Sequence, residues 1–176
     1  MKNLLLLFTA FGLFASCGDD DASTSALPND YQSSITIDGV AFTPSPATAS
    51  ESHVVTSASH GAPNVSERTF VIRQAGNNTV FKGISLYTNY TGTNASGTYT
   101  VYPAGPVENE FTGGGSYMLD DMVFPFNEGS TFKVTDLGNN KFKIELNNIH
   151  IGDGIASPMI INGTFEGTFT DMPLEP

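Results

Sequence analysis

The sequence predicts an all-β protein, a single antiparallel β-sandwich or open β-barrel that follows a signal peptide and a flexible tether. Apolar and polar residues alternate with a period of two in the C-terminal third, for example over residues 141–146. Short runs rich in β-branched and aromatic residues are separated by Gly, Asn and Pro turns, and such short connections favour antiparallel pairing. After the signal, no stretch of about ten residues has the i, i+3, i+4 apolar spacing of a helix.

Residues 1–16 have the layout of a secretory signal peptide. Lys2 precedes an apolar run from Leu4 to Phe14, which is shorter than the roughly 20 residues that a transmembrane helix needs. Cys17, the only cysteine, directly follows Ala15-Ser16. Two small side chains leave room for a peptidase, and the thiol behind them can carry a diacylglycerol. An ordinary signal peptide with an incidental cysteine is the alternative.

These residues resemble the lipobox of bacterial lipoproteins, with Phe14 where leucine is usual. The four residues that follow resemble the acidic export tag of Bacteroidota lipoproteins: Gly18, Asp19, Asp20 and Asp21. The resemblance implies a lipid on Cys17 that anchors the protein in the outer membrane, facing the cell exterior or the periplasm. A solvated acidic linker is the alternative for the tag. Several acyl chains give a stable anchor, whereas one gives marginal attachment.

Residues 17–33 are expected to form the tether, because they are rich in Asp and Ser and show no apolar period. Residues 34–172 are expected to form one β-domain. The mature chain of 160 residues (176 − 16) suits a single domain. With its one thiol acylated, the domain has no disulfide, so burial of its Phe and Tyr side chains stabilises it.

Before residue 130 the expected strands are short, at residues 34–42, 54–55, 69–73, 80–87, 97–102 and 116–119. Asp38-Gly39 is a turn pair that closes a tight hairpin within the first of them. Gly76-Asn77-Asn78 is a turn between the third and fourth. The run Gly113-Gly114-Gly115 lacks the Lys and Ser or Thr of a phosphate loop, and we expect a flexible loop tip there.

The C-terminal third predicts strands at 131–135, 141–146 and 159–169, with a turn at Asn139-Asn140. Asn147-Asn148 shifts the phase, so that Ile149 and Ile151 continue one position out of step, as a β-bulge produces. The side chains expected in the core are Phe132, Val134, Phe142, Ile144, Leu146, Phe165 and Phe169. The order of Gly97-Thr98-Tyr99, this hairpin and the segment 162–165 resembles small flavobacterial-type Bacteroidota lipoproteins, which implies a β-domain of unknown role.

Composition and motifs exclude several kinds of chemistry. A net charge of −11 with seven Lys and Arg disfavours nucleic acid. His53 and His60 have no Cys or acidic residue at metal-ligand spacing, so we expect no metal and no cofactor. No serine lies in Gly-x-Ser-x-Gly. The carboxylates at Asp120-Asp121, Glu108 and Glu110 are interpreted as solvated loop acids, with calcium at Asp120-Asp121 or Asp153 as a minor alternative.

The tyrosines are the best candidates for ligand contacts, because flat rings with a polar tip suit sugar stacking and protein interfaces. The four candidate residues are Tyr87, Tyr90, Tyr102 and Tyr117; core or rim packing is the alternative. We therefore expect a non-catalytic surface lipoprotein that binds a glycan, a peptide or an envelope partner. A structural component of an envelope complex is the second hypothesis, and a hydrolase is the least supported.

Overall fold

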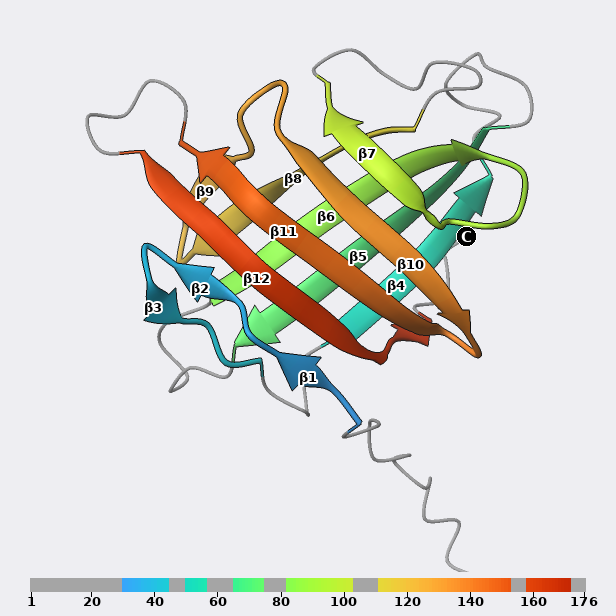
Figure 1. Cartoon of the computed structure of the whole chain (residues 1–176), viewed down its shortest axis with the longest axis horizontal. Helices are drawn as coiled ribbons and strands as arrows, with labels where there is room; N and C mark the ends of the chain where they lie inside the picture. The colour runs from blue at the N-terminus through green and yellow to red at the C-terminus, as the bar shows by residue number, and fades with distance from the viewer. Residues whose placement is uncertain are drawn as a thin grey trace, which may run out of the picture.

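The computed structural model describes residues 30–44, 50–56, 65–74, 82–102, 111–152 and 158–171. These residues form 13 strands in one curled open sheet and no helix, which confirms the all-β fold class (Figure 1). The strands are β1 (Gln32–Ser33), β2 (Thr36–Ile37), β3 (Val40–Ala41), β4 (Ser50–Thr56), β5 (Val65–Gln74), β6 (Lys82–Thr91), β7 (Gly97–Val101), β8 (Thr112–Leu119), β9 (Met122–Pro125), β10 (Thr131–Gly138), β11 (Lys141–Ile151), β12 (Met159–Thr168) and β13 (Thr170–Asp171).

The sheet follows the order β13-β4-β5-β6-β8-β7-β10-β11-β12-β2-β3, with β1 added to β12 and β9 added to β8. It curls so that β4, β5, β6 and β8 lie behind β7, β10, β11 and β12 (Figure 1). The inner faces of these two halves meet, and the apolar side chains of both halves fill the space between them.

The hairpin of β10 and β11 agrees with the sequence pattern. Asn139 and Asn140 both have positive φ, 53° and 59°, the backbone that a tight type I′ turn requires and that Asn tolerates. The register shifts between Leu146 and Ile149, opposite β12, and Asn148 has a φ of 53°. The predicted bulge is therefore confirmed, and it lets Ile149 return to the inner face. All seven predicted core side chains are buried.

Aromatic rings join the two halves of the sheet across the interior. The Phe70 ring of β5 meets the rings of Phe142 and Phe169 edge to face, at centroid distances of 5.1 and 5.2 Å. Phe165 meets Phe169 at 5.3 Å. Truncating a buried Phe to Ala typically costs about 3–5 kcal/mol. This cluster therefore carries a large part of the roughly 5–15 kcal/mol that holds a domain together.

The short connections led us to expect antiparallel pairing throughout. Two of the described strand pairs are parallel instead. β7 and β8 are parallel, with Thr100 opposite Thr112 and Val101 opposite Gly113. β13 is parallel to β4. The overlap of β7 with β8 covers only these two residue pairs.

The predicted loop tip at the glycine run is wrong, because these residues lie within β8. Aromatic rings from elsewhere pack on their inner face. A Cβ at Gly113 would come within 2.9 Å of the Phe132 ring, and one at Gly115 within 2.8 Å of the Phe126 ring. Packing of a ring on a strand glycine replaces the missing side chain and explains how a run of low β-propensity stays extended.

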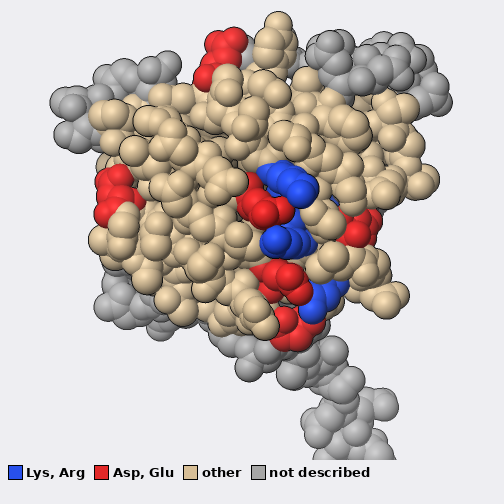
Figure 2. Space-filling view, viewed as in Figure 1, with Lys and Arg blue, Asp and Glu red and all other residues tan. Residues whose placement is uncertain are grey.

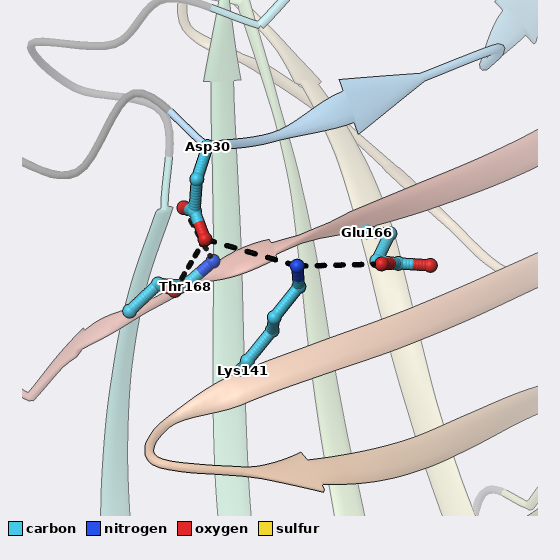
Figure 3. A network of polar contacts seen from close by, with 4 residues as sticks. All are labelled: Asp30, Lys141, Glu166 and Thr168. Atoms are coloured by element: carbon cyan, nitrogen blue, oxygen red, sulfur yellow. Dashed lines mark hydrogen bonds and ion pairs between the residues drawn. The ribbon is translucent and has the colours of Figure 1, made fainter.

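The described chain includes residues 30–33 of the predicted tether, and the last two of them form β1. Gln32 and Ser33 pair with Glu166 and Phe165 of β12. Figure 3 shows the contacts just before β1: Asp30 accepts hydrogen bonds from the Thr168 N–H and hydroxyl, at 3.2 and 2.9 Å. Lys141 Nζ lies 3.8 Å from Asp30 Oδ2 and 3.4 Å from Glu166 Oε1.

Charged side chains gather in one band on the outer face of β10, β11 and β12 (Figure 2). Lys133 and Lys143 each contact Glu145, at 3.6 and 3.3 Å, next to the pairs made by Lys141. These lysines are the polar half of the period-two pattern, and exposed pairs of this kind typically contribute less than about 1 kcal/mol each. The band is thus a solvated face in which the charges offset one another.

We expect Asp30→Asn to lower the melting temperature slightly at neutral pH and not at low pH. The hydrogen bonds from Thr168 hold the pKa of the Asp30 carboxyl below its ordinary value of 3.8, aided by the charge of Lys141. Folding therefore favours the charged form. That stabilisation is present above pH 3.8 and is lost as the pH falls through the lower pKa of the folded state. Thermal unfolding of wild type and variant between pH 2 and 7 measures this difference.

The control is Asp121→Asn, in the exposed turn between β8 and β9. A constant difference between wild type and Asp30→Asn at every pH would contradict the role of the Asp30 charge.

Candidate functional site

The phase of β6 divides its two candidate tyrosines between opposite faces. Ile84, Leu86 and Tyr90 point into the core, and Tyr90 is 2 % exposed. Tyr87 lies on the other face and is 40 % exposed. Tyr90 is therefore a core residue, which corrects its assignment as a ligand contact. The alternation of Ile84 and Leu86 is a sequence signal that could have separated the two tyrosines.

Tyr117 also belongs to the core. It is 5 % exposed and stacks on Phe124 of the neighbouring strand β9, with ring centroids 6.1 Å apart. Burial raises the pKa of its phenol, with a smaller contribution from the charge of Asp120. Tyr99 is fully buried as well, and its hydroxyl donates to the Ala95 carbonyl at 2.6 Å. The assignment of Tyr117 to ligand binding is therefore wrong.

The remaining candidates, Tyr87 and Tyr102, line one hollow of about 380 Å³. It lies where one edge of β8 passes from pairing with β7 to pairing with β9. The Tyr102 N–H, just after β7, donates to the Gly113 carbonyl at 3.1 Å, and the Phe126 N–H, just after β9, donates to the Gly115 carbonyl at 2.8 Å. Two strand ends thus diverge on either side of Gly114 and leave a depression above it. We call this hollow the tyrosine groove.

Gly114 allows the Tyr87 ring to lie against the strand. The two residues are opposite each other in the register of β6 and β8, and a Cβ at Gly114 would overlap the Tyr87 ring and hydroxyl. Burial raises the pKa of the Tyr87 phenol, and the charge of Glu67 adds to the effect. The hydroxyl therefore stays neutral at physiological pH and can both donate and accept hydrogen bonds.

Polar groups surround the two rings. Ser85 and Ser116 are opposite each other on the same face, and Glu128 lines the groove from the turn after β9. Aromatic faces next to hydroxyls and a carboxylate can stack on a flat ligand and bond to its hydroxyl groups. The sequence had no signal for these three polar residues, because their place in the groove depends on strand pairing.

The other candidates from the sequence do not form a site among the described residues. Asp120 and Asp121 are exposed in the turn between β8 and β9. His53 lies in β4 opposite Thr69, and His150 Nε2 lies 3.1 Å from Asn148 Nδ2. In the described part of the chain, no three His, Cys, Asp or Glu side chains could together hold a metal ion. The candidates outside the described residues are Cys17, Gly18, Asp19, Asp20, Asp21, His60, Glu108, Glu110 and Asp153.

No protein-family model, curated protein or solved structure matches the chain. The described residues include no helix with the length and apolar character needed to cross a membrane. The tyrosine groove is therefore the feature of the molecule that points to a function.

We expect Gly114→Ala to displace the Tyr87 ring, because the new methyl group would occupy the position of that ring. Overpacking of this kind typically costs about 1–3 kcal/mol. In a Tyr87→Ala background, the same substitution should cost much less, since the overlap is gone. Chemical denaturation of the wild type, the two single variants and the double variant measures this coupling. Equal costs of Gly114→Ala in both backgrounds would contradict the contact.

Proposed function

We propose that the domain is a non-catalytic carbohydrate-binding module and that its ligand stacks on Tyr87 and Tyr102. The observation that carries this proposal is the presence of two half-exposed tyrosines, 40 and 44 % exposed, on the lining of one hollow. Contiguous exposed aromatic surface often marks a binding site, and a flat ring with a polar tip suits stacking on a sugar. Ser85, Ser116 and Glu128 would bond to the hydroxyl groups of the sugar.

A saccharide fits the groove better than a peptide does. Extended peptides commonly bind by adding a strand to an exposed sheet edge. At the groove, β8 is paired with β6 along one edge and with β7 and β9 along the other. Its backbone is therefore already bonded on both sides, and recognition falls to side chains. Aromatic rings of a protein stack on the faces of sugars, and its polar side chains hydrogen bond to the sugar hydroxyls.

The residues of the groove support binding and not hydrolysis. Glycoside hydrolysis usually needs two carboxylates across the scissile bond. Among the described residues that line the groove, Glu128 is the one carboxylate, and it lies beside serines and tyrosines. A single acid can orient a ligand through hydrogen bonds without supplying the second catalytic group.

We also propose that the module is held at the outer membrane by a lipid on Cys17 and faces the cell exterior, with Gly18 to Asp21 as the export signal. The support is the lipobox-like and tag-like sequence. A surface address and a sugar-binding groove are consistent with each other, because polysaccharides are available there.

Cys17→Ser tests the anchor. The wild-type chain should partition into detergent and incorporate a fatty-acid label, whereas the variant should stay in the aqueous phase without label. Ala15→Ser, which keeps both the thiol and a small residue before it, is the control and should behave as wild type. Wild-type protein without acyl mass would exclude lipidation.

Tyr87→Ala and Tyr102→Ala test the groove. Loss of one stacking ring should weaken glycan binding about tenfold, since a stacked aromatic contributes about 1 kcal/mol beyond the area that it buries. Val40→Ala is the control, because Val40 is 70 % exposed and does not line the groove. Binding is measured on a glycan array and then by calorimetry. If no glycan binds and the protein instead copurifies in a stable envelope complex, the structural hypothesis replaces this one.

A further inference from the structure

A second hollow adjoins the tyrosine groove. Its volume is about 470 Å³, and its lining residues are Thr98, Thr100, Tyr102, Phe111 and Thr112. Tyr102 lines both hollows. We call the second one the threonine hollow. The two hollows therefore meet at Tyr102.

The threonine hollow follows the outer face of β7. Thr98, Thr100 and Tyr102 are separated by two positions each, so their side chains point to one face, along about 13 Å of extended chain. Both threonines are exposed. The row therefore presents hydroxyl groups at regular intervals in the direction that leads away from the tyrosine groove.

An aromatic residue, Phe111, also lines the threonine hollow. Phe111 is 41 % exposed, and a Cβ at Gly97, on the inner face of β7 with Tyr99, would come within 2.5 Å of its ring. The same ring meets Tyr99 edge to face, with centroids 5.4 Å apart. Phe111 is thus held against the inner face of β7, and its exposed part lines the edge of the threonine hollow.

The floor of the threonine hollow contains a buried polar group. Thr112 is 5 % exposed, and no described residue hydrogen bonds to its buried hydroxyl. Buried polar groups in proteins are nearly always bonded, so this hydroxyl is an exception beneath the hollow; because it has almost no accessible surface, a ligand reaches it only if the lining moves.

Charge limits the class of ligand. Neither hollow has a Lys or Arg among its described lining residues, and Glu128 adds a negative charge at one of them. The whole chain carries a net charge of −11. An anionic sugar would therefore meet repulsion without a compensating cation.

We propose that the ligand is a linear, uncharged oligosaccharide that spans both hollows, with Tyr102 between its two contact regions. This inference rests on the proposed carbohydrate-binding function and adds the length and the charge of the ligand. It predicts that affinity grows with chain length until both hollows are filled.

The experiment uses the full-length chain, purified from membranes in a detergent without sugar headgroups. Calorimetry follows binding of cello-, malto- and manno-oligosaccharides of one to six units, beside oligogalacturonates as the acidic counterpart. For the neutral series that binds, affinity should rise at least tenfold between one unit and four. Oligogalacturonates of equal length should bind at least tenfold more weakly.

Variants separate the two hollows. Phe111→Ala and Thr100→Val should reduce the affinity for four units about threefold to tenfold, towards that for one or two units, and leave the shorter sugars unchanged. Thr100→Val keeps a β-branched side chain on an exposed position, so it is the variant that tests the hollow if Phe111→Ala weakens the fold. Tyr87→Ala should weaken binding at every length.

The outcomes distinguish this inference from the proposed function. If affinity depends on Tyr87 and is the same at every length, or if neither variant of the threonine hollow changes it, the extended site is wrong and the binding module stands. Tighter binding of oligogalacturonates would overturn the uncharged ligand. If none of these probes binds and none binds on the array, both proposals fail.

Discussion

The curl of the sheet depends on the contact of aromatic rings across its interior. Phe70 comes from one half of the sheet, whereas Phe142, Phe165 and Phe169 come from the other, and their edge-to-face packing holds the halves together. Phe169 lies between β12 and β13. Directly after it, β13 pairs with β4 at the far edge of the sheet. The described residues include no disulfide, helix or metal cluster that could replace this packing.

The candidate site is a consequence of the same packing. Rings inside the core fill the space above Gly113 and Gly115, and the Tyr87 ring covers Gly114 on the outside. The glycine segment of β8, which has no side chains of its own, therefore has rings on both faces. On the outer face the ring is half exposed, and the divergence of β7 and β9 keeps it accessible. The groove exists because β8 contributes backbone and no side chains at this point.

Sequence alone predicts the fold class and the second half of the sheet, and it predicts much less of the site. The alternation of apolar residues in β10 and β11, the turn at Asn139-Asn140 and the bulge at Asn148 are local properties, and the structure has all three. The glycine strand could not be predicted, because its packing partners are distant in sequence. For the same reason, the sequence did not show that Tyr87 and Tyr102 line one hollow. Nor did it show that Tyr117 stacks on Phe124.

The pairing of β1 with β12 has a consequence for the order of folding. Asp30 and Thr168 are 138 positions apart and are hydrogen bonded, and among the described strands β1 pairs with β12 alone. A chain made from its N-terminus therefore cannot place β1 until almost the entire sequence is available. Contacts between such distant residues close large loops at an entropic cost and slow folding. The first strand of the sheet is thus completed by one of the last to be synthesised, so a nascent chain remains incompletely folded until its final segment has been made.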